Sequence, residues 1–229
     1  MAKQKRTKTK AKQGAPRQPA PEAAPVKRGR RKATEAKLEN LLATAAELMA
    51  QKGYDNMSIR DVARATGYSL AGMYYYFDSK EQLLFQIQRN TFESLVTEQE
   101  AAVQRAKSAK AKLEALVRNY LDFFLRHTNE LKVCAFEHES LKDAAYEEVR
   151  DIRHRWYRLL AGIVADLTGL DPAADDASIR HYTLFIFGML NWIFMWFDER
   201  RDTPIETLGD EMIHMIFHGL PRQTKNKKG

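Results

Sequence analysis

The chain has 229 residues, of which 44% are hydrophobic and 29% are charged, and its formal net charge is +7. This length allows one or two domains with a sizeable core, and the longest apolar run, Tyr182 to Phe197, is too short to span a membrane and contains Asn191. Cys134 is the only cysteine, which excludes an internal disulfide, and no apolar stretch follows the basic N-terminus as it would in a signal peptide, so we expect a cytoplasmic protein without a membrane segment.

Most of the positive charge lies at the N-terminus. Residues 1–34 contain 12 Lys or Arg against Glu22 alone, a net of +11, so that residues 35–229 sum to −4 in a chain of +7. A Pro-, Ala- and Lys-rich stretch cannot bury enough apolar surface to fold alone, and we expect it to be disordered. It is either a solubilising tail or an arm that binds DNA phosphates. In the second case Arg28, Arg30 and Arg31 would follow the DNA backbone or enter the adjacent minor groove.

A first amphipathic helix is predicted from Glu35 onward. Apolar residues recur there at three- and four-residue intervals as far as Met49, which forms one apolar stripe. Gly53 follows at the position where a glycine commonly ends a helix.

Two shorter helices are predicted next. Ser58 stands three residues before Asp61 and has the character of an N-cap, and Gly67 ends the helix that it begins. Ser69 can then cap a third helix. Two short helices joined by a tight turn have the dimensions of a helix-turn-helix.

The third helix explains a row of aromatic residues. Its apolar face, at helical spacing, consists of Leu70, Met73 and Phe77. Tyr74 and Tyr75 project from the other faces, where a phenolic ring can contact a thymine methyl or a sugar and its hydroxyl can donate to a phosphate. Lys80 stands at the start of a fourth helix, so its ammonium and the free backbone N–H groups there can hold the same phosphate.

Residues 57–84, MSIRDVARATGYSLAGMYYYFDSKEQLL, resemble the DNA-binding signature of the TetR family of transcriptional regulators. The resemblance implies an all-α homodimer with a small N-terminal helix-turn-helix domain and a larger helical domain for effector binding and dimerisation. Leu70, Ala71 and Gly72 depart from the usual pattern of Lys or Arg, Gly and Thr, so fewer polar groups reach the bases. The predicted DNA-contacting residues are Ser58, Arg60, Ser69, Leu70, Ala71, Gly72, Tyr74, Tyr75 and Lys80, with Arg28, Arg30 and Arg31 of the arm.

Long helices are predicted beyond residue 84, near 80–106, 110–127, 130–139, 143–168, 175–199 and 205–218. The expected organisation is a disordered basic arm at 1–34, a helix-turn-helix domain at 35–82, a helical effector-binding and dimerisation domain at 83–220, and a basic C-terminal tail at 221–229.

The sequence offers little support for catalysis or a metal site. Glu137 to Glu139 and the pair His214 and His218 are weak candidates for metal ligands, because no helical His-Glu-x-x-His element accompanies them. The chain also lacks a glycine-rich phosphate loop and a Gly-x-Ser-x-Gly elbow. We expect no catalytic residues, no metal and no cofactor.

The stretch HYTLFIFGMLNWIFMWFDERR, residues 181–201, is either buried core and dimer seam or part of an effector site. Asn191 needs a protein or ligand partner, because an unpaired buried amide costs about 1–3 kcal/mol. The segment GMLNWIFMWF resembles the penultimate helix of TetR-type sensors of acyl-coenzyme A thioesters. This resemblance implies an acyl chain among Phe92, Tyr120, Phe124, Trp156 and Trp192, with Arg89 or Arg153 near the coenzyme's phosphates.

Together these features predict a homodimeric transcriptional repressor that binds a palindromic double-stranded DNA operator and is released by a small apolar effector, such as an acyl-coenzyme A of lipid or aromatic catabolism. Three alternatives stay open: an activator on the same fold, a non-specific DNA-compacting protein that depends on the basic arm, and an enzyme.

Overall fold

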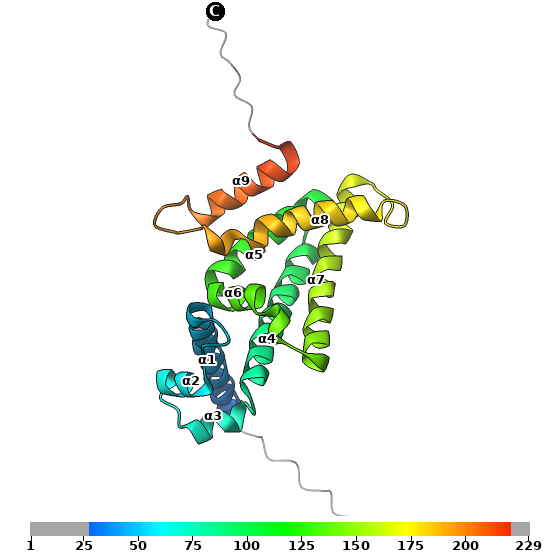
Figure 1. Ribbon diagram of the computed structural model, residues 1–229. Coiled ribbons are helices and arrows are strands. Elements are labelled where there is room, and N and C mark those ends of the chain that lie inside the picture. Colours follow the sequence, from blue (N-terminus) through cyan, green and yellow to red (C-terminus); the bar gives the residue numbers. More distant parts are fainter. Residues whose placement is uncertain (1–27, 221–229) are drawn as a thin grey trace, which may run out of the picture. The chain divides into compact units, whose positions relative to one another are not determined.

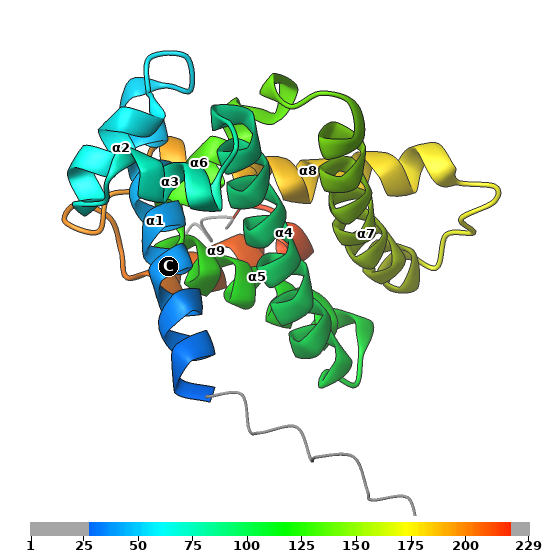
Figure 2. The same cartoon turned by 90° about the horizontal axis from the view of Figure 1, so that it is seen from below.

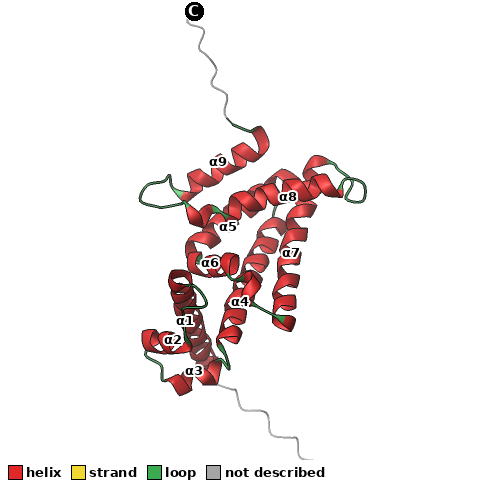
Figure 3. Cartoon of the chain, viewed as in Figure 1, coloured by secondary structure: helices red, strands yellow, loops and turns green. Residues whose placement is uncertain are grey.

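A computed structural model describes residues 28–220, and over that range the chain forms helices joined by loops, with no β-strand (Figures 1 and 3). The all-α fold class is thereby confirmed. None of these helices has the length and apolar character of a membrane-spanning segment. The elements are α1 (Arg28–Lys52), α2 (Ile59–Thr66), α3 (Leu70–Tyr76), α4 (Lys80–Gln104), α5 (Ala109–Arg126), α6 (Thr128–Phe136), η1 (His138–Ser140), α7 (Asp143–Thr168), α8 (Asp176–Asn191), η2 (Ile193–Met195) and α9 (Ile205–His218).

The boundaries of α1, α2 and α3 follow from local chemistry. After α1 the chain turns at Gly53, whose φ of +79° is a left-handed conformation that favours glycine. Ser58 and Asp61 form a capping box at the start of α2, and Gly67 ends α2 with a φ of +74°. Ser69 caps α3 by accepting a hydrogen bond from a backbone N–H of its first turn. The predicted caps and turns are therefore present.

The apolar stripe of α1 is buried in one core with α2 and α3. Leu41, Ala45, Met73 and Phe77 are all fully buried members of the same cluster. Since α3 is only seven residues long, its stability depends on this packing rather than on helix propensity.

The helices from α4 to α9 build the larger part of the chain. α4, α5 and α7 pack against one another, α5 also carries α9, and α8 packs on α7 (Figure 2). Their shared core is aliphatic and aromatic, with Leu95, Leu113, Leu116 and Phe123 fully buried. This helical frame surrounds the cavity described below.

Several boundaries differ from expectation, and two of them differ by many residues. α1 begins at Arg28 rather than near Glu35, because Arg, Lys and Ala favour helix and can extend one that is already nucleated. Residues 1–27 and 221–229, most of the predicted arm and the whole tail, lie outside the described part of the chain.

The helix expected to reach residue 199 ends at Asn191, and η2 follows. The sequence contains no helix breaker at this point, so a continuous helix was expected. Ile193 and Phe194 are buried here, and this packing ends the α-helix.

Candidate functional site

The outer face of α3 presents two tyrosines. Met73 and Phe77 are fully buried, whereas Tyr74 and Tyr75 are 51% and 82% exposed. Tyr76 is half-buried and packs edge-on against Tyr75, with ring centroids 5.2 Å apart. Packing therefore fixes α3 from behind and leaves two phenolic side chains for contact with a partner.

The first turn of α3 offers few polar groups. Ser69 Oγ accepts a hydrogen bond from the backbone N–H of Gly72 at 3.0 Å, so this hydroxyl is used in capping. A Cβ on residue 72 would stand 3.2 Å from Ser69 Oγ, which favours glycine there. Leu70 is half-buried against the core and Ala71 is exposed. Direct base contact by these residues remains a prediction.

Ser58 and Arg60 occupy the start of α2. The hydroxyl of Ser58 donates to Asp61 Oδ2 at 2.6 Å and accepts from the Asp61 backbone N–H at 3.3 Å. Hydrogen bonds from the side chain and backbone of Ser58, and then the charges of Lys52 and Arg64, hold the pKa of Asp61 below its usual value. Ser58 therefore has a structural role beside its predicted DNA contact, while Arg60 is exposed.

Lys80 is less free than the sequence suggested. Its ammonium donates to the carbonyl oxygens of Tyr54 at 2.9 Å and Asp55 at 3.4 Å, and it lies 4.2 Å from the centroid of the Tyr54 ring. Lys80 thus braces the α1–α2 loop, and its predicted phosphate contact would compete with this role. Arg28, Arg30 and Arg31 fall within the first turns of α1.

A cavity of about 300 Å³ lies between α4, α5, α6, α7 and the α8–η2 turn. This volume is at the lower end of the range for small-molecule sites. Its wall includes most of the residues that were predicted for the effector: Phe92, Tyr120, Arg153, Trp156, Asn191 and Trp192.

The aromatic and polar groups of the cavity are ordered by one another. The rings of Tyr120 and Trp156 stack with centroids 5.7 Å apart, and Trp156 Nε1 donates to Gln99 Oε1 at 2.8 Å. Tyr120 Oη donates to Asn191 Oδ1 at 3.1 Å, which supplies the partner that Asn191 requires. Burial raises the pKa of Tyr120, so the phenol stays protonated and keeps this donor. The wall is therefore preorganised.

Among the described residues, Arg153 is the one basic residue on the cavity wall. It is half-buried, and its guanidinium carbon lies 5.9 Å from the centroid of the Phe92 ring. Within residues 28–220 no carboxylate forms an ion pair with it. An anionic group on a ligand would supply that missing partner.

Two predicted effector residues are not at the cavity. Arg89 pairs with Glu148 at 2.5 Å, and Phe124 packs edge-on against Phe197 with ring centroids 5.9 Å apart. The sequence did not identify part of the wall. These residues are Leu131, Cys134, Ala135 and Phe136 of α6, a helix without a distinctive pattern, and Phe194 of η2. Burial raises the pKa of the Cys134 thiol, so its thiolate fraction at neutral pH is small.

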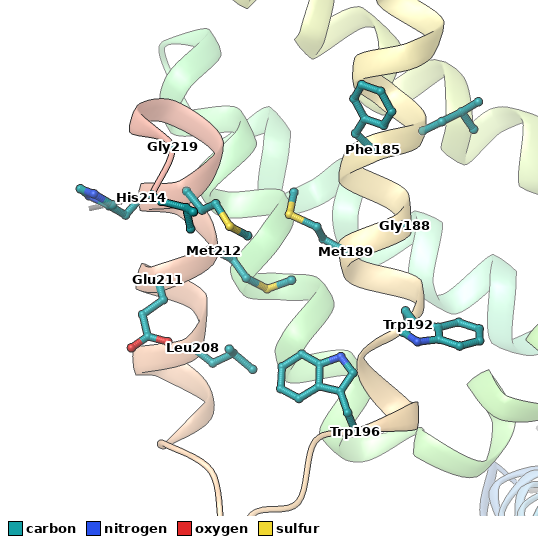
Figure 4. A pocket seen from close by; sticks show the side chains of 13 residues that line it. Phe185, Gly188, Met189, Trp192, Trp196, Leu208, Glu211, Met212, His214 and Gly219 are labelled. Atoms are coloured by element: carbon teal, nitrogen blue, oxygen red, sulfur yellow. The ribbon is translucent and has the colours of Figure 1, made fainter. Parts of the chain in front are cut away.

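A separate apolar groove of about 840 Å³ runs between α8 and α9 (Figure 4). Met189 of α8 and Met212 of α9 face each other across it, and Trp196 lies at one end (Figure 4). Phe185 is 66% exposed and Trp192 is 57% exposed in the single chain, so these two side chains are not part of its core, and their place in a dimer seam or an effector site stays a prediction. Trp192 borders both the groove and the cavity.

The described residues hold no group of three or more His, Cys, Asp or Glu side chains placed to bind a metal ion. The rings of His214 and His218 are neighbours, with centroids 5.0 Å apart, at the exposed end of α9.

A capped helix-turn-helix on a helical domain defines a DNA-binding transcriptional regulator. Residues 41–87 match the family model "Bacterial regulatory proteins, tetR family", and residues 106–220 match "Tetracyclin repressor-like, C-terminal domain". The chain belongs to the TetR family. Its members are regulators rather than enzymes.

Similar proteins agree with this assignment. The HTH-type transcriptional repressor KstR2 of Rhodococcus jostii (strain RHA1) is 35% identical over 187 residues, which cover 79% of this chain and 89% of the relative. A TetR-family regulator from Bordetella parapertussis 12822 has the same fold, with a TM-score of 0.76 at 22% identity over 81% of this chain and 96% of that chain. AibR, solved in complex with isovaleryl coenzyme A and operator DNA, has a TM-score of 0.70 at 25% identity over 79% and 97% of the two chains.

Proposed function

We propose that the protein is a homodimeric transcriptional repressor that binds a palindromic operator through α2 and α3 and is released by a compact acyl thioester. The observation that carries the proposal is the cavity of about 300 Å³ with Arg153 in an otherwise largely apolar and aromatic wall. Such a cavity suits a short or branched acyl group, and Arg153 suits an anionic part of the same ligand. The likeness to AibR, solved with isovaleryl coenzyme A and operator DNA, supports this ligand class.

The proposed domain organisation keeps the helix-turn-helix at residues 35–82 and the effector and dimerisation domain at 83–220. Two copies of the chain would cover the α8–α9 groove, because a soluble monomer rarely leaves so many large apolar side chains exposed side by side. In a two-fold dimer the two copies of α3 would enter successive major grooves about 34–36 Å apart.

Selection of bound duplexes from a random library, followed by footprinting, tests the DNA part of the proposal. We expect an inverted repeat with two protected half-sites. Uniform protection without a preferred sequence would indicate the non-specific binder instead. Fused to a reporter, the selected site should reduce expression when the protein is present, whereas increased expression would identify an activator.

Titration of the protein–operator complex with acyl thioesters tests the effector part. Isovaleryl coenzyme A is expected to release the operator at lower concentration than long-chain thioesters, because the cavity is small. Coenzyme A alone and the free acid should be weaker, since each supplies only part of the binding surface. No release by any thioester would contradict the proposed effector class, and turnover of a thioester would favour an enzyme.

Tyr75→Ala is expected to weaken operator binding about tenfold, which corresponds to the roughly 1.4 kcal/mol of one hydrogen bond to DNA. Its side chain is 82% exposed, so the core behind α3 should stay intact. A gel-shift titration at fixed salt measures the change in affinity, with Tyr146→Ala, a partly exposed tyrosine of α7 away from the α8–α9 groove and the cavity, as the control. Equal affinity of the Tyr75 variant and the parent would show that α3 does not contact the operator through Tyr75.

Deletion of residues 1–27 should lower affinity for any duplex and leave sequence preference largely intact. This boundary spares α1, which begins at Arg28. For each DNA phosphate that the segment neutralises in the parent, the deletion should flatten the log–log salt dependence of binding by about 0.9. An unchanged slope would identify the segment as a solubilising tail.

A further inference from the structure

The cavity and the helix-turn-helix are joined by a small set of hydrogen bonds that centres on Glu137. This residue directly follows α6. Its Oε1 accepts the backbone N–H of Tyr54, in the α1–α2 loop, at 3.0 Å. Its Oε2 accepts the hydroxyl of Ser140 at 3.0 Å, which orients the carboxylate. One acidic side chain thereby contacts a loop that lies 83 positions away in the sequence.

α4 holds both ends of this contact. The fully buried Gln88 donates its Nε2 to the backbone carbonyl of Glu137 at 2.9 Å. At the start of the same helix, Lys80 donates to the carbonyl of Tyr54 at 2.9 Å. Eight residues of α-helix span about 12 Å. The contact of Glu137 with Tyr54 therefore closes a ring of hydrogen bonds that runs through α4, the loop and the end of α6.

The same turn of α6 forms part of the cavity wall. Cys134, Ala135 and Phe136 line the cavity and immediately precede Glu137. Phe136 packs edge-on against Phe194, another wall residue, with ring centroids 5.4 Å apart. Leu131, Val133 and Cys134 are buried, so packed neighbours leave α6 little room for independent adjustment. A ligand that displaces this wall must therefore move the backbone next to Glu137, where α6 ends.

We propose that Glu137 couples the ligand cavity to the DNA-reading helices, and this rests on the proposed function. Its carboxylate contacts neither the DNA-facing residues nor the cavity, so it acts as a positioning residue. Its hydrogen bond makes the position of the α1–α2 loop, and with it the start of α2, dependent on the position of α6. Ligand and operator then affect each other's binding by the same factor through this hydrogen bond.

The test measures operator affinity with and without saturating isovaleryl coenzyme A, and thioester affinity by itself. In the parent the thioester should weaken operator binding by a factor in the usual range for allosteric proteins, about 5- to 150-fold. In Glu137→Ala this factor should fall to about twofold or less, with both separate affinities within about threefold of the parent. Glu137→Gln should keep the parent's factor, because its amide oxygen can still accept the Tyr54 N–H.

Glu114→Ala is the matched control. It removes one carboxylate of α5, whose ion pair within the described part of the chain is with Lys110 at 4.0 Å, and it should leave coupling unchanged. If isovaleryl coenzyme A releases Glu137→Ala from the operator as it releases the parent, the role of Glu137 is contradicted and the proposed function is not. Glu137→Ala could instead lose helicity. In that case a Glu137→Gln variant that has parental helicity but has lost coupling would also contradict the role of Glu137.

A second readout uses operator DNA without effector. Operator binding should change amide hydrogen exchange of residues 131–137 in the parent and in Glu114→Ala, and leave it unchanged in Glu137→Ala. This measurement tests the role of Glu137 even if the parent does not respond to thioesters. Such insensitivity would contradict the proposed effector class alone. No change at residues 131–137 in the parent, or the same change in both, would show that Glu137 does not transmit the signal.

Discussion

Phe185→Asp is expected to convert the protein into a monomer that no longer binds its operator tightly. Phe185 is 66% exposed beside the α8–α9 groove of the single chain. In a two-fold dimer the same patch serves both copies, so the substitution acts twice. Loss of a buried phenyl ring costs about 1.5–3 kcal/mol for each copy, and burial of an unpaired carboxylate adds to this. The dimer dissociation constant should rise by about a thousandfold or more.

Sedimentation at micromolar concentration measures this change, and a gel-shift titration measures the consequence for DNA. A monomer engages one half-site, so operator affinity should fall by about a hundredfold or more. Ala177→Asp also introduces an aspartate on α8, at an exposed position outside the groove, and should remain dimeric. Circular dichroism must show parental helicity for the Phe185 variant. A dimeric Phe185→Asp protein with full operator affinity would place the subunit interface elsewhere.

The DNA-reading part of the fold was largely predictable from sequence because its boundaries are local. Ser58, Gly67 and Ser69 act within three or four residues of their own position, through caps and a left-handed turn. The division of the aromatic row into buried Phe77 and exposed Tyr75 follows from helical periodicity alone. Such features do not depend on the rest of the molecule.

The larger domain was predictable in its helices and only partly in its site. Asn191 was expected to need a partner, but nothing in the sequence identifies Tyr120, 71 positions away, as that partner. Phe124 and Tyr120 both belong to α5, yet one packs on Phe197 and the other faces the cavity. Periodicity distinguishes buried from exposed positions, and it does not distinguish one buried environment from another.

The interactions of Lys80 and Glu137 were also beyond sequence reasoning. Each contacts the α1–α2 loop, and each does so through a backbone group of that loop. Nearly every residue has a backbone N–H and carbonyl, so no sequence pattern marks the recipient of such a bond. Lys80 stands at the start of a helix, which suggested a phosphate contact. Its structural role became visible only with the loop in place.

Arg153→Leu is expected to make the protein poorly responsive to an anionic effector while leaving operator binding intact. Leucine keeps the wall apolar and removes the only basic group that the described residues place on the cavity wall. A hydrogen bond between charged groups contributes about 1.5–3 kcal/mol, so effector affinity should fall about 10- to 100-fold. Calorimetric titration with isovaleryl coenzyme A measures the affinity, and operator release by the same thioester measures the response.

Arg158→Leu is the matched control, since Arg158 is exposed on the same helix and does not line the cavity. It should bind the thioester as the parent does. An uncharged apolar ligand gives a second comparison. In the parent such a ligand leaves the charge of Arg153 unpaired, whereas in Arg153→Leu it does not, so the variant should bind this ligand at least as well as the parent does. If Arg153→Leu weakens charged and uncharged ligands equally, the residue shapes the cavity and does not recognise an anion. If neither ligand is affected, the anionic group lies outside the cavity, and a part of the effector other than the acyl group must reach the surface of the protein.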